Sequence, residues 1–278
     1  MLLKDKVAII TGGSRGIGKA IAAAFLKEGA KCFLIARTHS GLEQARKELG
    51  KVVEIFAADV GDLQTVQRAV HACLSVFGKV DILVNAAGIQ GPIGLFTENS
   101  PQDWEVTLQV NLLGTLFSMQ AAVPVMLLQK KGKIINFSGG GATSSRPRFS
   151  AYAASKTAVV RLTEIAADEL KGSGIDINAV APGAVNTRMT EEVIQAGERA
   201  GREYKLALSQ KRDHQASPEK AVALTVFLAS SQSDGLSGKL ISAIWDKWED
   251  IPKHLSDIMS SDVYTLRRIK PKDRGFKW

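Results

Sequence analysis

Residues 7–18 of the chain read Val-Ala-Ile-Ile-Thr-Gly-Gly-Ser-Arg-Gly-Ile-Gly, and Lys-Ala-Ile-Ala-Ala-Ala-Phe follows directly. A short apolar run that leads through a glycine-rich turn into a helix-forming run predicts a strand, a tight loop and a helix. Backbone N–H groups in such a loop can approach a phosphate closely, and the helix dipole favours its negative charge. We therefore expect a phosphate-binding loop here. The residues expected to form it are Gly12, Ser14, Arg15, Gly16, Ile17 and Gly18.

The spacing of these glycines leaves the kind of phosphate ligand open. It differs from the G-x-G-x-x-G spacing of the commonest dinucleotide-binding loop. The stretch also resembles the phosphate-binding loop of nucleoside triphosphatases in part, because Gly18 and Lys19 follow Gly13 at the sequence spacing of that loop. Ala20 then stands where a Ser or Thr hydroxyl would bind magnesium, so a phosphotransferase is disfavoured. A tight turn that needs small residues and holds no ligand is the simplest alternative.

Short apolar strands alternate with longer amphipathic helices along most of the chain. The predicted strands are Val7–Ile10, Phe33–Ala36, Val52–Phe56, Ile82–Val84, Ile134–Phe137 and Ile175–Val180. The predicted helices are Gly16–Glu28, Leu63–Phe77, Asp103–Gln129 and Tyr152–Leu170. Strands that are almost continuously apolar are typical of a parallel sheet covered on both faces. The alternation therefore predicts an α/β protein with a single doubly wound parallel sheet, a Rossmann fold, and helices on both faces.

The chain has no Pro- or Ser-rich linker, so we expect a single domain. Residues 1–243 are expected to form its nucleotide-binding body. Within them, the polar and interrupted stretch at about 186–217 is expected to form a loop over the substrate. Residues 244–278 carry two tryptophans near their start, a short predicted helix at Pro252–Met259 and a basic end. We expect them to form a C-terminal extension of the same domain.

The composition is that of an ordinary globular protein, with 45% hydrophobic residues, 23% charged residues and a net charge of +8 over 278 residues. Basic residues are interleaved with acids, so no nucleic-acid partner is expected. No apolar run approaches the roughly 20 residues of a membrane span, and no signal peptide is evident. A cytoplasmic location without membrane contact is therefore expected. Cys32 and Cys73 have no partner at ligand spacing, so reduced thiols and no metal site are expected.

The end of the second predicted strand bears on the choice of cofactor. An NAD site offers an acid there to the ribose hydroxyls, whereas an NADP site offers an arginine to the 2′-phosphate. In this chain the strand ends with Ala36 and Arg37, and no acid follows before Glu43. Arg37, assisted by Arg15, therefore predicts NADP(H). The alternative is that Arg37 is only a solvated strand end.

Tyr152 and Lys156 are four residues apart on a predicted helix, so they project from the same face. A tyrosine has a pKa near 10, and we expect the ammonium of Lys156 to lower it. The pair would then serve as a general acid and base for a carbonyl or an alcohol. Ser138 directly follows a predicted strand, at the edge where open α/β sheets bind ligands. Its hydroxyl is expected to hold the substrate oxygen beside Tyr152.

Together these motifs resemble the short-chain dehydrogenase/reductase family over roughly residues 4–243. The stretches that carry the resemblance are Thr11-Gly12-x3-Gly16-Ile17-Gly18, Asp59-Val60, Asn85-Ala86-Ala87-Gly88, Asn111, Ser138, Tyr152-x3-Lys156 and Pro182-Gly183-x3-Thr187. The resemblance implies hydride transfer between a nicotinamide and a carbonyl or alcohol, with Tyr152 as the acid and base. It implies a catalytic set of Asn111, Ser138, Tyr152 and Lys156, in which Asn111 holds a water of a proton relay.

The resemblance also implies a set of cofactor contacts beyond the loop and Arg37. These are Asp59 and Val60 near the adenine, Asn85, Ala86, Ala87 and Gly88 beside the fourth strand, Tyr152 and Lys156 at the nicotinamide ribose, and Pro182, Gly183, Val185 and Thr187 near the carboxamide. Family members commonly form homodimers or homotetramers through the helices at 103–129 and 152–170. The same assembly is implied here.

Within the family the chain is most similar to the 3-oxoacyl-carrier-protein reductases, but it departs from them in several places. Arg146 and Arg148 lie in a slightly long segment before Tyr152, and residues 239–248 replace the usual Val-Asp-Gly-Gly ending. The two arginines favour an anionic substrate, either linked to an acyl carrier or a phosphorylated or nucleotide-linked sugar. They are equally compatible with a solvated loop. A sugar or secondary-alcohol dehydrogenase of the same family and a non-catalytic dinucleotide sensor or scaffold are the alternatives.

Overall fold

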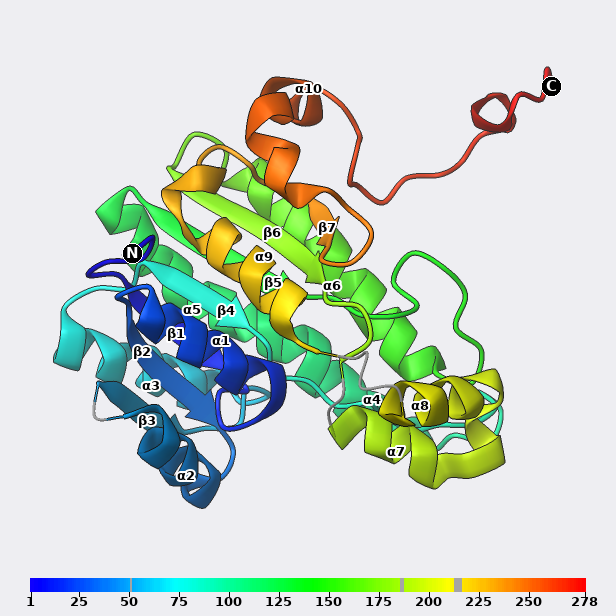
Figure 1. The fold of residues 1–278 in the computed structure, drawn as a ribbon, viewed down its shortest axis with the longest axis horizontal. Helices are drawn as coiled ribbons and strands as arrows, with labels where there is room; N and C mark the ends of the chain where they lie inside the picture. The colour runs from blue at the N-terminus through cyan, green and yellow to red at the C-terminus, as the bar shows by residue number, and fades with distance from the viewer. Residues whose placement is uncertain (51, 186–187, 213–216) are drawn as a thin grey trace.

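The computed structural model describes residues 1–50, 52–185, 188–212 and 217–278. Over these residues seven strands form one sheet in the order β3-β2-β1-β4-β5-β6-β7, and every adjoining pair is parallel (Figure 1). The strands are β1 (Val7–Thr11), β2 (Lys31–Ala36), β3 (Val53–Ala57), β4 (Ile82–Asn85), β5 (Gly132–Phe137), β6 (Ile175–Ala181) and β7 (Leu240–Ser242). The strand order reverses between β1 and β4, where doubly wound sheets bind their ligands. The predicted fold class is confirmed.

Helices cover both faces of this sheet (Figure 1). The α-helices are α1 (Gly16–Lys27), α2 (His39–Leu49), α3 (Leu63–Phe77), α4 (Pro101–Leu108), α5 (Gly114–Gln129), α6 (Ser150–Glu169), α7 (Arg188–Ala196), α8 (Arg202–Arg212), α9 (Glu219–Ala229) and α10 (Leu255–Met259). One face carries α1, α2 and α9, and the other carries α3, α5 and α6.

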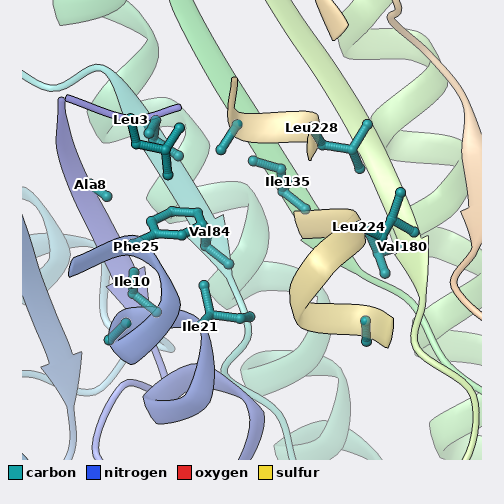
Figure 2. Close-up of a cluster of buried hydrophobic side chains, with 14 of the residues drawn as sticks. Leu3, Ala8, Ile10, Ile21, Phe25, Val84, Ile135, Val180, Leu224 and Leu228 are labelled. Atoms are coloured by element: carbon teal, nitrogen blue, oxygen red, sulfur yellow. The ribbon is translucent and has the colours of Figure 1, made fainter. Parts of the chain in front are cut away.

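Alternating strand residues supply the two cores, because successive side chains of a strand point to opposite faces. On β1, Ala8 and Ile10 belong to the cluster beneath α1 and α9, whereas Val7 and Ile9 belong to the cluster beneath α3, α5 and α6. Figure 2 shows the first cluster, in which Phe25 of α1 lies among strand side chains. Since both faces are buried, the strands are apolar almost throughout. Because all of the strands are parallel, their carboxyl ends lie along a common edge.

Some elements differ from those predicted. Elements β7, α2 and α9 were not predicted, and the predicted helix at 103–129 consists of α4, a π-turn at Gln109–Leu113 and α5. Among the described residues, one helical segment is long and apolar enough to cross a membrane. This segment is Pro101–Gln129. In this fold it lies in the helix layer, where α5 packs on α3 and on the sheet.

Residues 248–266 of the C-terminal extension pack onto the body of the protein, whereas most of residues 267–278 are exposed and extend away from it (Figure 1). Ile251 and Ile258 are buried in the same core as α1 and α9, and Trp248 packs on Phe227 at a ring distance of 5.6 Å. Farther on, the backbone N–H of Leu240 in β7 donates to the Tyr264 carbonyl at 2.8 Å. The extension thus covers the free edge of β7. The boundary predicted at residue 243 stays a prediction.

Candidate active site

A cleft of about 670 Å³ opens at the carboxyl ends of the strands. Residues from distant parts of the chain line it, because each follows a strand of the parallel sheet or begins the helix after it. Among the predicted site residues, its walls include Ile17, Ala86, Gly88, Ser138, Tyr152, Lys156, Pro182, Gly183 and Val185. The remaining predicted residues lie outside these walls, and Thr187 lies outside the described residues.

The glycine loop is built for close backbone approach. Gly12 has φ +68°, and a Cβ placed there would lie 2.9 Å from the backbone nitrogen of Ala87. A side chain at this position would therefore strain the backbone and push β1 and β4 apart. The helix that follows starts without a side-chain cap on its N–H groups, and its first turn contains no acid. These free N–H groups suit an anion such as a pyrophosphate.

Two exposed arginines flank this loop. The structure places Arg15 at the start of α1 and Arg37 just after β2, and both side chains are exposed. The nearest following acid, Glu43, accepts two hydrogen bonds from Arg46 of its own helix at 2.8 and 2.9 Å. It is therefore engaged elsewhere. The loop and the end of β2 thus offer positive charge to a ligand rather than a carboxylate.

Ser138 and Tyr152 meet at the bottom of the cleft. Ser138 directly follows β5 and is 3% exposed, and its Oγ has no hydrogen-bond partner among the described residues. The neighbouring Gly139 touches the Tyr152 hydroxyl so closely that any side chain at 139 would collide with it. A buried hydroxyl without a partner is rare in a folded protein. Its position suits a substrate oxygen that would supply the missing bond.

Lys156 lies one turn below Tyr152 on α6 and is 4% exposed. Its ammonium donates a hydrogen bond of 2.8 Å to the Phe137 carbonyl at the end of β5 and lies 5.8 Å from the centroid of the Tyr152 ring. Burial lowers the pKa of Lys156 to about 8, because the charged form loses its hydration. The ammonium is therefore held rigidly at the cleft and titrates near the physiological range.

The predicted direction of the Tyr152 pKa shift was wrong. Burial raises the pKa of this phenol, and the cation that opposes the shift is Arg146 rather than Lys156. The Arg146 guanidinium lies 5.4 Å from the Tyr152 ring centroid and 4.0 Å from that of Phe149. The tyrosine is thus a protonated hydroxyl at neutral pH, which is the form that donates a proton.

Asn111 lies behind the cleft, inside the π-turn between α4 and α5. Its side-chain amide donates to the Ile89 carbonyl and to Ser155 Oγ, both at 3.0 Å, and accepts from the Ile89 N–H at 2.9 Å. A Cβ added at Gly88 would lie 3.2 Å from Asn111 Oδ1 and 3.5 Å from Lys156 Nζ. Asn111 therefore ties the loop after β4 to α6, and its predicted role with a water stays a prediction.

Several predicted cofactor contacts also make contacts inside the protein. Asp59 is exposed and accepts the Gly61 N–H at 2.9 Å, while Val60 is buried in a small apolar cluster. Asn85 is buried, and its side-chain N–H donates to Asn136 Oδ1 at 2.9 Å. Its side chain therefore links β4 to β5 and is not part of the cleft wall. Of this group, Asp59 and the backbone after Asn85 are the parts open to a ligand.

Two helices of the predicted substrate loop cover the outer part of the cleft. The stretch expected as a polar loop at 186–217 contains α7 and α8, and Val193 and Ala207 of these helices form a buried cluster with Phe149 and Tyr152. Arg202, Glu203 and Leu206 line the cleft from the same side. The catalytic candidate Tyr152 is therefore packed directly against this helical cover.

The two arginines expected to meet an anionic substrate are engaged within the protein. Arg146 pairs with Glu203 of α8 at 3.0 Å, in addition to its stacking on Phe149. Arg148 donates to the Arg199 carbonyl at 3.5 Å, and its own carbonyl accepts the Gly94 N–H at 3.0 Å. These contacts fix the segment before Tyr152 and leave little free positive charge for an anion.

Several residues that line the cleft were not predicted as site residues. Among them are Gln90, which follows β4, and Trp245 and Tyr264, which belong to the C-terminal extension. Gln90 follows the Asn-Ala-Ala-Gly stretch by two positions, so its place after a strand was the signal that could have found it. Trp245 is 86% exposed, whereas Trp248 is part of the core, so the two tryptophans of the extension have different roles. Tyr264 reaches the cleft because the extension folds back along β7.

Comparison with known proteins agrees with this geometry. The family model described as short chain dehydrogenase matches residues 6–198, which include the loop, Ser138, Tyr152 and Lys156. The chain belongs to the short-chain dehydrogenase family. Family membership means an oxidoreductase fold that binds a nicotinamide dinucleotide and acts on a small molecule with a C–OH or carbonyl group.

Relatives within the short-chain dehydrogenase family differ in substrate. The chain is 35% identical to a 3-oxoacyl-[acyl-carrier-protein] reductase of Thermotoga maritima, over 87% of this chain and 97% of the relative. It is 36% identical to a D-threitol dehydrogenase of Mycolicibacterium smegmatis, over 85% and 90%. A solved actinorhodin polyketide ketoreductase with NADPH superimposes with a TM-score of 0.79 at 28% identity, over 85% of this chain and 95% of the other. Family membership thus leaves the substrate class undecided.

Proposed function

We propose that the chain is an NADP(H)-dependent oxidoreductase that reduces a ketone, or oxidises the corresponding secondary alcohol, with Tyr152 as the general acid and base. The observation that carries the proposal is the buried group of Ser138, Tyr152 and Lys156 at the bottom of the cleft. A module that only senses a dinucleotide has no need of a buried phenol beside an unpaired hydroxyl and a buried ammonium.

In the reduction, Ser138 Oγ and the Tyr152 hydroxyl hold the substrate oxygen. NADPH, when bound, supplies the hydride that the carbonyl carbon gains, and is left as NADP⁺. The substrate oxygen takes the proton of Tyr152 as its negative charge develops, so the ketone becomes an alcohol. The raised pKa of Tyr152 keeps the phenol protonated until that point.

The phenolate formed in this step has three sources of positive potential near it. The Lys156 ammonium and the Arg146 guanidinium lie 5.8 and 5.4 Å from the ring centroid. Tyr152 also lies in the first turn of α6, where the helix dipole favours negative charge. These groups stabilise the phenolate until a proton returns from solvent, and the same groups make it a base for alcohol oxidation.

NADP(H) rather than NAD(H) is favoured by the exposed Arg37 after β2 and by the engagement of Glu43 with Arg46. We place the enzyme in the cytoplasm. We also propose that it forms a homodimer or homotetramer through the apolar outer face of α5, where Leu127 and Leu128 are exposed. Both the acyl-thioester and the sugar-alcohol substrate classes are represented among the relatives.

Replacement of Tyr152 by phenylalanine tests the mechanism. Loss of the hydroxyl removes the proton donor, so NADPH oxidation with a panel of ketones is expected to fall roughly 10²–10⁴-fold. NADPH binding, followed by fluorescence titration, is expected to change little. Tyr204→Phe, a tyrosine of α8 packed in the same apolar cluster, is the matched control.

Full activity in Tyr152→Phe would contradict the proposed mechanism. Tight NADPH binding by the wild type without turnover of any ketone or alcohol would instead favour the sensor. The two results are distinguishable, since the first concerns the variant and the second concerns the unaltered protein.

A further inference from the structure

Gln90 carries a buried amide whose hydrogen-bonding capacity is not met inside the protein. The side chain is 3% exposed, and Nε2 has no hydrogen-bond partner among the residues described. The buried amide of Asn178, by contrast, donates to the Leu236 carbonyl at 2.7 Å and accepts the Lys239 N–H at 3.1 Å. Asn85 Oδ1 and Asn99 Nδ2 also lack a partner among the described residues, but they lie outside the cleft wall. Buried polar groups nearly always have a hydrogen-bond partner. The unpartnered amide of Gln90 therefore indicates that a ligand supplies the missing hydrogen bond.

The position of Gln90 makes this exception informative. Six buried side-chain atoms lack a hydrogen-bond partner in the described part of the chain, and only those of Gln90 and Ser138 belong to residues of the cleft wall. Ser138 Oγ is the group expected to bind the reacting oxygen of the substrate. Gln90 thus provides a second polar group without a hydrogen-bond partner in the same cleft. A second oxygen atom on the substrate could accept a hydrogen bond from its Nε2.

Charged side chains of both signs and several hydroxyl and amide side chains form the remaining polar lining of the cleft. Its carboxylates belong to Glu203 and Asp246, which bond Arg146 and the Ser242 N–H at 3.0 and 2.6 Å. These acids and Arg146 are therefore engaged within the protein, while Arg202 and Lys156 also line the cleft. Hydroxyl and amide side chains supply much of the other polar surface: Thr143, Ser144, Ser145 and Gln210.

We propose that Gln90 is a specificity-determining residue that binds a hydroxyl group of the substrate, and that the substrate is a hydroxy ketone or the polyol formed from it. This inference rests on the proposed function. An amide offers both N–H donors and a carbonyl acceptor, and a hydroxyl group complements either. A ketone without the hydroxyl would leave the amide buried and unpaired, so it is bound less well in the transition state.

The test compares two ketones that differ in one group. Hydroxyacetone and 2-butanone differ in a hydroxyl against a methyl, and both are reduced with NADPH by the wild type and by Gln90→Met. Methionine has nearly the length and volume of glutamine, so packing is retained. We expect the wild type to prefer hydroxyacetone in kcat/KM, and Gln90→Met to lower that preference roughly tenfold, the loss of about one hydrogen bond. Turnover of 2-butanone is expected to rise in the same variant, because no buried amide is then left unpaired by this ketone.

Gln67→Met, on the exposed face of α3, controls for the substitution itself. A preference that is unchanged in Gln90→Met, or a wild type that favours 2-butanone or an acetoacetyl thioester over hydroxyacetone, overturns the inference. If Gln90→Met does not fold, Gln90→Leu replaces it with the same expectation. A wild type that reduces neither ketone with either nicotinamide contradicts the proposed function as well, whereas equal turnover of both ketones contradicts the inference alone.

Discussion

Two clefts lie at opposite ends of β5 and β6, and the larger one is not the candidate site. The cleft at the amino ends has a volume of about 860 Å³, against about 670 Å³ at the carboxyl ends. In the larger cleft, Lys133 pairs with Asp176 and Asp234 at 2.7 and 2.8 Å. Lys239 donates to the Ser261 and Val263 carbonyls, both at 3.0 Å.

The buried lysines of the amino-end cleft therefore already have partners in the protein, and Glu164 Oε2, which lacks a hydrogen bond there, is ion-paired with Arg161. Ser138 Oγ and Gln90 Nε2 of the carboxyl-end cleft have neither a hydrogen bond nor an ion pair among the described residues. Volume does not separate the two clefts, but the presence of polar atoms without any partner does. The comparison suggests that a ligand site in this fold is marked by polar groups that the fold itself leaves unmatched.

The difference between the two clefts is tested most directly by replacing one buried lysine in each of them. The first replacement is Lys156→Met in the carboxyl-end cleft. Loss of this cation is expected to lower kcat/KM for ketone reduction roughly 10²–10⁴-fold, because the Tyr152 phenolate loses a stabilising charge. Stability is expected to rise by about 1–3 kcal/mol at pH 7, since burial holds the pKa of Lys156 at about 8, below its ordinary value. The lost hydrogen bond to the Phe137 carbonyl offsets part of that gain.

The lowered pKa of Lys156 determines how the stability difference between Lys156→Met and the wild type depends on pH. Folded protein binds the Lys156 proton more weakly than unfolded protein does, so the wild type is penalised below about pH 8. The penalty disappears as the pH rises from about 8 to the lysine value near 10.4. The stability advantage of Lys156→Met, measured by chemical unfolding, is therefore expected to shrink across that interval. An advantage that grows with pH would contradict the assignment.

At the amino end, Lys133→Met is expected to do the reverse. It leaves Asp176 and Asp234 without their shared cation, and Asp176 is largely buried. Stability is expected to fall by about 2–3 kcal/mol, as when one partner of a buried pair is removed. KM and kcat are expected to stay within about twofold, because the lysine is at the far end of the sheet. A large change in KM with unchanged stability would assign the larger cleft a role in binding.

Arg37→Asp gives the smallest expected effect and concerns a charge that the fold leaves free. Because Arg37 is exposed, its removal is expected to leave stability within about 0.5 kcal/mol. The dissociation constant of NADPH is expected to rise roughly tenfold or more through loss of a charge-assisted bond to the 2′-phosphate. That of NADH is expected to change much less. Equal effects on both, by fluorescence titration, would mean that the phosphate is bound elsewhere.

The parts of the fold that sequence could predict are those with a strong local pattern. Six of the strands were predicted within a few residues because their apolar runs are long, but β7 has only three residues, Leu240–Ser242, too few for a pattern. Helix α2 begins with His-Ser-Gly, which forms helices weakly, and its hydrophobic face is narrow. The π-turn around Asn111 changes the backbone hydrogen bonds locally, and the spacing of apolar residues does not predict such a change.

For the candidate site, spacing predicted which residues come together but not their environment. Tyr152 and Lys156 lie on one face of α6 as predicted, and Ser138 is beside them. The direction of the Tyr152 pKa shift depends on burial by α7 and α8 and on Arg146, which tertiary packing decides. Likewise, only the folded structure shows that Glu203 neutralises Arg146 and that Gln90 is buried without a partner.

The attachment of the last segment to α6 has a consequence for when the protein becomes active during synthesis. Glu164 of α6 accepts the Leu266 N–H at 2.6 Å, a contact across 102 positions of the chain. The same helix carries Tyr152 and Lys156, and Tyr264 of the docked segment forms part of the cleft wall. A nascent chain still attached to the ribosome therefore has its chemistry in place before its substrate pocket is closed. Docking of the segment around Tyr264, rather than formation of the sheet, completes the wall against which a substrate is bound.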